Sequence, residues 1–307
     1  MTAPRVTAVV VTYNRRELLL ESLAALDTQT RAPDTVVVVD NASTDGTAEA
    51  LRSREGVTPV QVHSLERNTG GAGGFTFGIA AAVRGGADLV WLMDDDTVPT
   101  PDALAALLDA RSGYPGPPPA LVASRVVWTD GRDHPMNTPR PKPLVSAVER
   151  SAAETVRCVP VRSASFVSVL IDARVCKQRG LPVADYFLWN DDFEFTTRLL
   201  RGNTGLLAPS SLVVHKTRTF GSTDADPGER FFWEVRNKIW LLTRSRSLAP
   251  LERALYTAST LRRWALTIRR SSDRATLLHA LRRGAWAGVR RGPRSNEIVL
   301  AGTGYTR

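Results

Sequence analysis

Runs of β-branched residues separated by amphipathic stretches dominate the N-terminal part of the chain. Val6–Tyr13 and Thr35–Asp40 are almost continuous valine runs. Each is followed by a helical pattern, over Arg15–Gln29 with periodic leucines and over residues 43–53. Continuous apolar strands that alternate with helices are typical of parallel strands covered on both faces. The pattern therefore predicts a doubly wound α/β domain.

Two further strands each end in chemically distinctive residues. The strand Pro59–Ser64 leads into a glycine-rich loop that opens a helix, and Asp88–Met93 runs directly into three aspartates, Asp94–Asp96. Ligands of open α/β sheets bind outside the carboxyl ends of the strands. We therefore expect a ligand site where Asp40, the glycine-rich loop and the three aspartates meet. The glycines do not have the G-x-G-x-x-G register, which argues against a dinucleotide site.

The remainder of the chain has weaker patterning. Helical periodicity resumes at Glu229, and the segment beyond Pro293 has too little hydrophobic pattern to predict a packed element, so we expect disorder there. We predict one large domain over residues 1–228, a helical region over 229–295 and a tail over 296–307. The other expected elements are strands at Phe166–Ile171 and Ser211–His215, a helix at Asp191–Arg201, a connector at Gly113–Pro119, a long loop at Thr129–Lys142 and a lid loop at Thr217–Gly228.

Positive charge is concentrated in the C-terminal helical region. The chain carries a net charge of +9, and residues 229–295 hold 16 Lys and Arg against 4 Asp and Glu. Cys158 and Cys176 have no metal-binding or CxxC spacing, the N-terminus does not resemble a secretory signal, and no apolar run approaches about 20 residues. We therefore expect a cytoplasmic protein with reduced thiols and at most a peripheral attachment to a membrane.

The three consecutive aspartates suggest a metal site. Asp94–Asp96 follow a very apolar strand, where repulsion between the carboxylates is costly without a cation. Mg²⁺ and Mn²⁺ favour carboxylate oxygens together with substrate phosphates. A solvated turn or a helix cap is the simpler interpretation of three aspartates in isolation.

Several motifs taken together decide between these interpretations. VVVTYN, VVVVDNASTDGT, NTGGAGGF, WLMDDDTVPTPDAL and WNDDFEFTTRLLRG occur in the order and approximate spacing of family 2 glycosyltransferases, over roughly Val6–Trp240. With the later histidine and FFWEVRN, the chain most resembles the galactofuranosyltransferases of that family, and rhamnosyltransferases that use dTDP-rhamnose remain an alternative. The resemblance implies a GT-A fold, a nucleotide-sugar donor such as UDP-galactofuranose, a divalent metal and inversion at the anomeric carbon.

The resemblance also implies the residues that bind the donor and the metal. Thr12, Tyr13 and Asp40 match the positions around the base, although Asp40 could instead cap a helix. His215 matches a third metal ligand. The implied donor-binding residues are Thr12, Tyr13, Asp40, Asp94 and Asp95, and the implied metal ligands are Asp94, Asp96 and His215. Arg67, Asn68 and Gly71 are further donor-binding candidates, because the glycines of Gly70–Gly74 would let the backbone approach the donor. A structural tight turn is the alternative for that segment. Lys216, Arg218 and Arg230 are candidates for diphosphate contacts or simply surface charges.

By the same resemblance, the WNDD segment holds the catalytic carboxylates. Asp192 matches the general base, and Asp191 and Trp189 match positions that contact the acceptor. Two aspartates at a helix start also interact favourably with the helix dipole, which is the purely structural interpretation.

The basic region suggests how an acceptor would be presented. Trp233, Trp240, Trp264 and Trp286 alternate with the Arg pairs 262/263, 269/270, 282/283 and 290/291, a composition that suits helices lying on anionic lipid. We expect a glycan or polyprenyl-diphosphate-linked glycan acceptor at the inner face of the plasma membrane, and no nucleic acid partner. A packed helical subdomain is the alternative for this region. For the whole chain, a noncatalytic protein that binds nucleotide sugar or a membrane surface is the alternative of another class.

Overall fold

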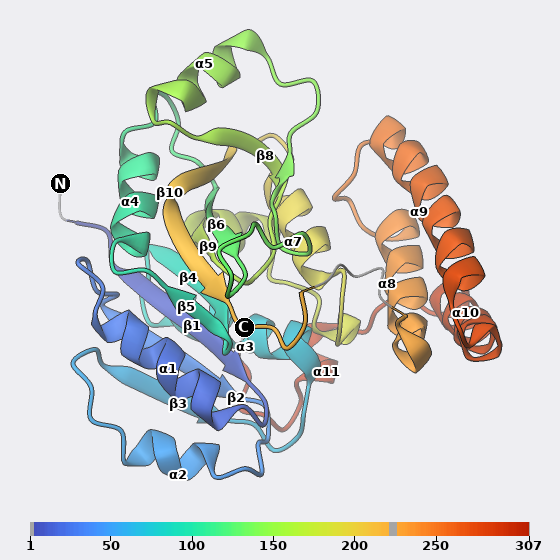
Figure 1. Ribbon diagram of the computed structural model, residues 1–307, viewed down its shortest axis with the longest axis horizontal. Helices are drawn as coiled ribbons and strands as arrows, with labels where there is room; N and C mark the ends of the chain where they lie inside the picture. The colour runs from blue at the N-terminus through green and yellow to red at the C-terminus, as the bar shows by residue number, and fades with distance from the viewer. Residues whose placement is uncertain (1–2, 221–225, 307) are drawn as a thin grey trace.

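The structure, a computed structural model, describes residues 3–220 and 226–306. A central mixed sheet is covered by helices on both faces, and a lobe of C-terminal helices lies beside it (Figure 1). The predicted α/β class is confirmed. The strands of the described residues are β1 (Val6–Thr12), β2 (Thr35–Asp40), β3 (Val60–Ser64), β4 (Leu89–Asp94), β5 (Thr97–Pro99), β6 (Leu121–Val127), β7 (Arg140–Pro141), β8 (Val159–Ser163), β9 (Val169–Asp172) and β10 (Gly205–His215).

The sheet has a parallel half and a mixed half. Its strand order is β3-β2-β1-β4-β9-β6-β10-β8-β7, with β5 paired to the end of β10. The strands β3, β2, β1 and β4 are parallel neighbours, as the valine runs predict. The predicted strand at Phe166–Ile171 is β9, which lies antiparallel between β4 and β6. The short strands β5, β7 and β8 were not predicted, because strands of two to five residues carry too little periodicity.

Two apolar layers hold the helices against the sheet. Along β1, Ala8 and Val10 face a cluster that includes residues of α1, α2 and α4, whereas Val9 and Val11 face one that includes residues of α3, α6 and α7. This alternation follows from the two-residue period of a strand. The helices are α1 (Arg16–Asp27), α2 (Thr47–Arg52), α3 (Gly70–Arg84), α4 (Ala103–Ser112), α5 (Ala147–Thr155), α6 (Ala173–Arg179), α7 (Asp191–Leu199), α8 (Phe231–Thr243), α9 (Pro250–Arg270), α10 (Arg274–Arg290) and α11 (Asn296–Val299), with 3₁₀ turns η1 (Ala184–Tyr186) and η2 (Gly228–Arg230).

The glycine-rich segment is helical rather than a loop, which corrects the sequence prediction. Helix α3 already begins at Gly70, whose φ is +72°. A Cβ atom on Gly74 would lie 2.5 Å from Val11, and one on Gly78 would lie 2.4 Å from Val9. Gly74 and Gly78 therefore allow close packing of α3 on β1, whereas nothing lies within 4 Å of a Cβ built on Gly71.

The C-terminal helices form a small lobe that shares α8 with the main body. Phe231, Val235, Trp264 and Leu277 make its core. From the same helix, Trp240 packs on Tyr186 and Ala72, and Leu241 packs on Phe193. The predicted boundary after Gly228 thus precedes a helix that contacts both parts.

The segment beyond Pro293 is packed on the main body, contrary to the expected disorder. It contains α11, and Leu300 is fully buried. Arg294 pairs with Asp185 at 2.7 Å, and Asn296 accepts a hydrogen bond from the Ala184 backbone N–H. A few well-placed contacts hold this segment, so its weak hydrophobic periodicity was misleading. Within residues 3–220 and 226–306, no helix is both long and apolar enough to cross a bilayer.

Candidate active site

The carboxyl ends of neighbouring strands bring the predicted acidic residues to one edge of the sheet. Thr12 at the end of β1 is in register with Asp40 at the end of β2, and Val11 is in register with Asp94 at the end of β4. The Thr12 hydroxyl donates to Asp95 Oδ2 over 2.9 Å, so β1 holds the middle aspartate in place.

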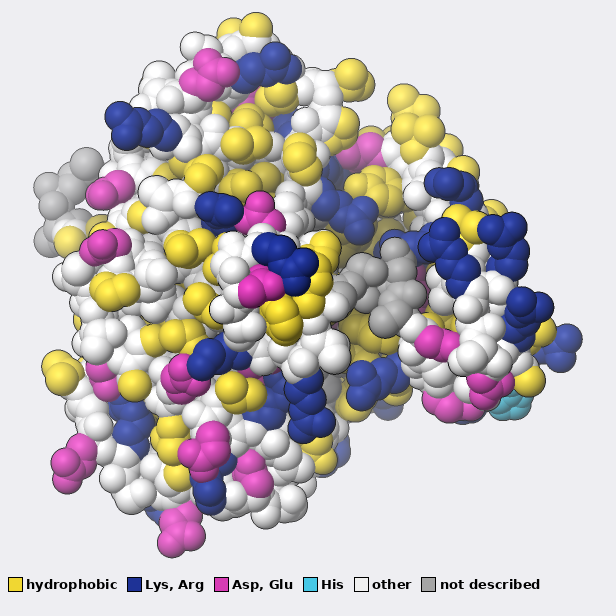
Figure 2. All heavy atoms as spheres, in the orientation of Figure 1, with side chains coloured by type: hydrophobic (Ala, Val, Ile, Leu, Met, Phe, Trp, Pro, Cys, Tyr) yellow, Lys and Arg dark blue, Asp and Glu magenta, His cyan; other side chains and the backbone are white. Residues whose placement is uncertain are grey.

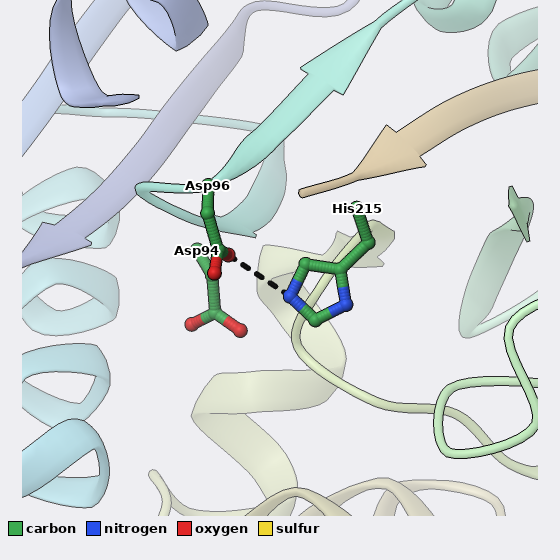
Figure 3. A group of neighbouring side chains, drawn as sticks. All are labelled: Asp94, Asp96 and His215. Carbon is green, nitrogen blue, oxygen red and sulfur yellow. Dashed lines mark ion pairs between the residues drawn. The ribbon is translucent and has the colours of Figure 1, made fainter. Parts of the chain in front are cut away.

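Asp94, Asp96 and His215 form a cluster at this edge (Figure 3). One potential ligand atom from each lies within 4.8 Å of the other two. His215 Nε2 is 2.9 Å from Asp96 Oδ1, and both side chains are buried. Two carboxylates and an imidazole are a suitable set of ligands for a hard or borderline divalent cation.

The pairing of β5 with β10 and a loop amide orient His215. Backbone pairing places His215 opposite Thr97, which follows Asp96. His215 Nδ1 lies 2.9 Å from Asn137 Oδ1, so Nδ1 donates its proton to the amide and Nε2 faces the carboxylates. Metal-binding histidines are commonly oriented by such a partner. Sequence reasoning missed Asn137, because it lies within the segment expected to be a long loop.

Electrostatic strain in the cluster favours a bound cation. Burial, reinforced by the charge of Asp96, raises the pKa of Asp94 to about 7. Burial lowers the pKa of His215, but its short contact with Asp96 and the charge of Asp94 raise it overall. A divalent ion would relieve the repulsion between the carboxylates and replace the histidine proton.

Arg15 is a cationic residue of the site that sequence reasoning missed. Its guanidinium lies 2.5 Å from Asp96 and 3.3 Å from Asp95, although the side chain is half exposed. By contrast, Lys216 pairs with Glu21 at 2.5 Å. Of these two cations, Arg15 is therefore the one that adjoins the carboxylates.

Asp191 and Asp192 lie at the start of α7, as expected. Burial raises the pKa of Asp191 well above its usual range, with a further contribution from Asp192. Burial also raises the pKa of Asp192, against the opposing charges of Lys238 and Arg140. A carboxylate with a raised pKa is suited to accept a proton near neutral pH.

The backbone before α7 is unusual. Phe187, Trp189 and Asn190 have φ values of 62°, 65° and 66°, which cost non-glycine residues about 1–3 kcal/mol each. Asn237 on α8 donates to the backbone carbonyls of Leu188 and Trp189 at 2.8 and 2.9 Å. Its side chain therefore holds the segment that delivers the aspartate pair.

A cavity of about 460 Å³ joins the two carboxylate groups. It lies between the main body and the C-terminal lobe, and its lining residues include Gly71, Asp94–Asp96, Trp189, Asp191, Asp192 and His215. The arrangement allows a cation-bound leaving group at the first carboxylate group and a proton acceptor at the second, within one cavity.

Several residues implied for donor binding do not line this cavity. Asp40 is buried and accepts a hydrogen bond from the Ser43 backbone N–H, whereas Tyr13 is exposed beside it. Arg67 donates to the carbonyls of Val299 and Ala301, both at 2.9 Å, because the packed C-terminal segment lies over it. Asn68 accepts from the Gly70 backbone N–H at the start of α3. Arg67 and Asn68 thus have partners within the protein and do not line this cavity, and their part in donor binding stays a prediction.

The predicted lid and the tryptophans of the basic region also differ from expectation. Residues 221–225 of the lid lie outside the described residues. Trp240 and Trp264 are buried, and Trp233 stacks on Phe187 with centroids 4.7 Å apart. Of the four tryptophans, Trp286 alone is largely exposed, because the others face α10, η1 or the loop before α7.

Known proteins share both this sequence and this fold. Residues 7–117 match the family described as Glycosyl transferase family 2. Galactofuranosyltransferase GlfT1 of Mycobacterium tuberculosis is 32% identical over 260 residues, covering 78% of this chain and 82% of that protein. The structure of S. aureus TarS 1–349 in complex with UDP-GlcNAc aligns with a TM-score of 0.63 at 18% identity, over 92% of this chain and 81% of that one. Mannosyltransferase PcManGT from Pyrobaculum calidifontis in complex with GDP-Man and Mn²⁺ aligns with a TM-score of 0.53 at 17% identity, over 98% and 86%.

These similarities, with the fold and the acidic cavity, define a glycosyltransferase of GT-A fold. The chain belongs to glycosyltransferase family 2, and within that family it is similar to galactofuranosyltransferases.

Proposed function

We propose that the chain is a metal-dependent, inverting galactofuranosyltransferase. It transfers galactofuranose from UDP-galactofuranose to a hydroxyl of a cell-envelope glycan or of a polyprenyl-diphosphate-linked glycan. The observation that carries the proposal is that two carboxylate groups line one cavity, Asp94–Asp96 with His215, and Asp191 with Asp192. The donor is suggested by the 32% identity to a galactofuranosyltransferase over most of both chains.

The residues of the cavity have the chemistry that a single displacement needs. Asp191 holds the acceptor hydroxyl, and Asp192 takes its proton as the oxygen attacks the anomeric carbon. The bond from that carbon to the donor diphosphate breaks on the opposite face, so the configuration inverts. Arg15, which is already adjacent to Asp95 and Asp96, contacts the departing diphosphate.

Asp94, Asp96 and His215 hold the divalent ion, Mn²⁺ or Mg²⁺. Two features of these residues suit a divalent ion. Their side chains offer two carboxylates and an imidazole as ligands. Asn137 binds Nδ1 of His215, so Nε2 faces the carboxylates. When bound, the ion neutralises charge that develops on the leaving diphosphate. The charge of Arg15 alone cannot balance three aspartates at this edge of the sheet.

The C-terminal lobe presents the enzyme to the inner face of the plasma membrane. The side chains of Leu251, Leu255, Leu261, Trp286 and Val289 are exposed on α9 and α10, interspersed with arginines. Apolar side chains among basic residues suit an anionic lipid surface. Such a position brings a lipid-linked acceptor to the cavity, which lies between this lobe and the main body.

A donor screen tests the proposal. Purified protein is given UDP-galactofuranose, UDP-hexopyranoses or dTDP-rhamnose with Mn²⁺, and nucleotide release and glycan products are measured. The expected result is turnover with UDP-galactofuranose and a product of inverted anomeric configuration. Turnover with dTDP-rhamnose alone would make the protein a rhamnosyltransferase. Absence of turnover with retained nucleotide-sugar binding would favour a noncatalytic binding protein.

A further inference from the structure

Two cations lie on the same aromatic ring beside the proposed general base. The Arg140 guanidinium carbon is 5.1 Å from the centroid of the Phe193 ring, and Lys238 Nζ is 5.2 Å from it. Phe193 directly follows Asp192. Arg140 comes from β7 and Lys238 from α8, so the main body and the C-terminal lobe each contribute one charge to the same part of the cavity.

The molecule is hollowed where these two parts meet. Figure 2 shows a recess between the main body and the C-terminal lobe, with Lys and Arg side chains gathered along it. The cavity is lined by Arg140, Lys238 and Arg263 as well as by Asp94–Asp96 and Arg15.

Lys238 is buried, and Glu234, four residues earlier on α8, is the main charge that stabilises its ammonium. Only 5% of its surface is exposed, and burial lowers its pKa to about 8. Its neighbour Glu234 is already engaged, because Glu234 pairs with Arg263 at 2.7 Å and accepts from Asn190 Nδ2 at 2.7 Å. Within the described residues, no ion pair or side-chain hydrogen bond involves the Lys238 ammonium. Glu234 therefore divides its charge among several partners, and Lys238, which lines the cavity, retains positive charge that a further anion would neutralise.

Arg140 is also available to a ligand. Its side chain is exposed at the cavity and forms no ion pair with any described residue. Both cations influence Asp192 electrostatically, but no ion pair within 4.0 Å joins either of them to that carboxylate in the described parts of the chain. Neutralising Asp192 therefore does not account for two cations at this place.

We propose that Arg140 and Lys238 form an anion subsite that binds a phosphate or diphosphate group of the acceptor. An arginine fork pairs with two phosphate oxygens, and a lysine supplies a compact second charge. Two positive charges match a diphosphate better than they match a single carboxylate. The subsite adjoins Asp192 rather than the Asp94–Asp96 cluster, so it serves the acceptor and not the donor diphosphate. This inference rests on the proposed function, because the ligand is the acceptor of the proposed glycosyl transfer.

The first experiment measures transfer to two acceptors that differ only in the group at the reducing end. One carries a neutral alkyl chain and the other an alkyl diphosphate. We expect the wild-type KM to be at least tenfold lower for the diphosphate acceptor, and we expect Arg140→Gln to remove this preference. The control Arg150→Gln changes an exposed arginine on α5 that forms no ion pair with a described residue, and should keep it. Equal KM values in the wild type would overturn the subsite and leave the proposed function intact.

Lys238 also affects the pKa of Asp192, so its test must separate binding of the acceptor phosphate from this effect on Asp192. Lys238→Gln should raise the KM for the diphosphate acceptor more than that for the neutral acceptor, and Lys238→Arg should restore most of the difference. Equal increases in KM for both acceptors would mean that Lys238 acts through Asp192 alone, and its place in the subsite would be lost.

A binding measurement tests the subsite without turnover. Protein saturated with UDP and Mn²⁺ is titrated with dimethylallyl diphosphate by calorimetry. Saturable binding that weakens at least tenfold in Arg140→Gln, but not in Arg150→Gln, supports the subsite even if no donor is turned over. Binding that occurs without UDP but is absent from the UDP-saturated protein would assign the probe to the donor site and overturn the proposal. Binding that neither variant changes would overturn it as well.

Discussion

The side-chain amide of Asn237 donates to the backbone carbonyl of Trp189 over 2.9 Å, across 48 residues of sequence. Trp189 has a positive φ and lies two residues before the aspartate pair. The same amide group reaches the carbonyls of Tyr186 and Leu188, each at 2.8 Å. One buried side chain on α8 therefore stabilises the strained segment that sets the direction of Asp191 and Asp192.

Asn237→Ala is expected to lower kcat about 100-fold with little change in the affinity for UDP. A small displacement of a catalytic group from its productive geometry can have an effect of this size. Asn203→Ala is a matched control, because it removes an amide that donates to the Leu199 carbonyl at 2.7 Å beyond the end of α7. Steady-state kinetics and thermal unfolding of both variants are the measurements. If Asn237→Ala loses stability but its folded fraction keeps full activity, Asn237 has only a structural role.

Asp192→Asn is expected to reduce transfer by about 10²–10⁴-fold while UDP and Mn²⁺ still bind. The change removes the proton acceptor and leaves the volume of the side chain almost unaltered. Asp185→Asn is the control, since Asp185 pairs with Arg294 and does not line the cavity. Calorimetric titration with UDP alongside turnover separates the two roles. Loss of UDP affinity as complete as the loss of turnover would make Asp192 a donor-binding residue.

As pH decreases, kcat is expected to fall at pH values well above the usual pKa range of an aspartate. Burial raises the pKa of Asp192, so the protonated, inactive form persists to a higher pH than in an exposed aspartate. The charges of Lys238 and Arg140 oppose this increase at Asp192, whereas burial and the charge of Asp192 raise the pKa of Asp191. Activity therefore falls as pH decreases through the raised pKa of the pair. Lys238→Met should move this fall in kcat to higher pH, because it removes an opposing charge, and a profile that moves to lower pH would contradict this account.

Removal of the divalent ion is expected to abolish transfer, and His215→Ala should raise the Mn²⁺ concentration needed for half-maximal activity. Asn137→Ala should raise it about 10–100-fold, because the imidazole loses the partner that orients it. Titration of Mn²⁺ into EDTA-treated protein gives the apparent affinities. His63→Ala is the control, since His63 packs on Phe77 away from the cavity. Full activity in excess EDTA would refute the metal requirement.

Replacing basic residues of the C-terminal lobe is expected to weaken binding to anionic vesicles without affecting a short soluble acceptor. The variant carries Gln in place of Arg262, Arg269, Arg270, Arg282 and Arg290. Each of these arginines is expected to contribute about 1 kcal/mol to binding at an anionic surface. Arg263 is kept, because it pairs with Glu234 at the cavity. Co-sedimentation with phosphatidylserine vesicles and turnover of both acceptor types are compared. Unchanged vesicle binding at moderate salt would contradict the proposed membrane-binding surface. Equal losses of turnover with both acceptors would mean that these arginines support the fold.

Much of the parallel half of the sheet was predictable from the sequence, whereas the mixed half was predictable only in part, through the strands at Phe166–Ile171 and Ser211–His215. The valine runs of β1 and β2 and the apolar strand before Asp94 are local signals, because a strand buried on both faces must be continuously apolar. The antiparallel position of β9 and the short strands β5, β7 and β8 depend on partners far along the chain. No local pattern could have indicated them.

The site shows the same division between local and distant information. Asp94–Asp96, Asp191, Asp192 and His215 were recognisable from their motifs, and the structure brings them to one cavity. Arg15, Asn137, Lys238 and Arg140 were not recognised, because their roles arise from their neighbours in the fold. The contacts of Arg67 with the C-terminal segment and of Asn68 with the start of α3 were likewise not foreseen, and the donor-binding role expected of these two residues stays a prediction.

The sequence by itself determined the parallel strands, the family and the identity of the carboxylates, because these are encoded in contiguous residues whose period and spacing can be read directly. The tertiary structure alone decided that α8 holds the strained segment before Asp191, that the tail covers Arg67, and that Lys238 is buried beside Asp192. Each of these depends on contact between residues tens to hundreds of positions apart. Such contacts form only when buried area and satisfied hydrogen bonds offset the entropy of closing the chain between them.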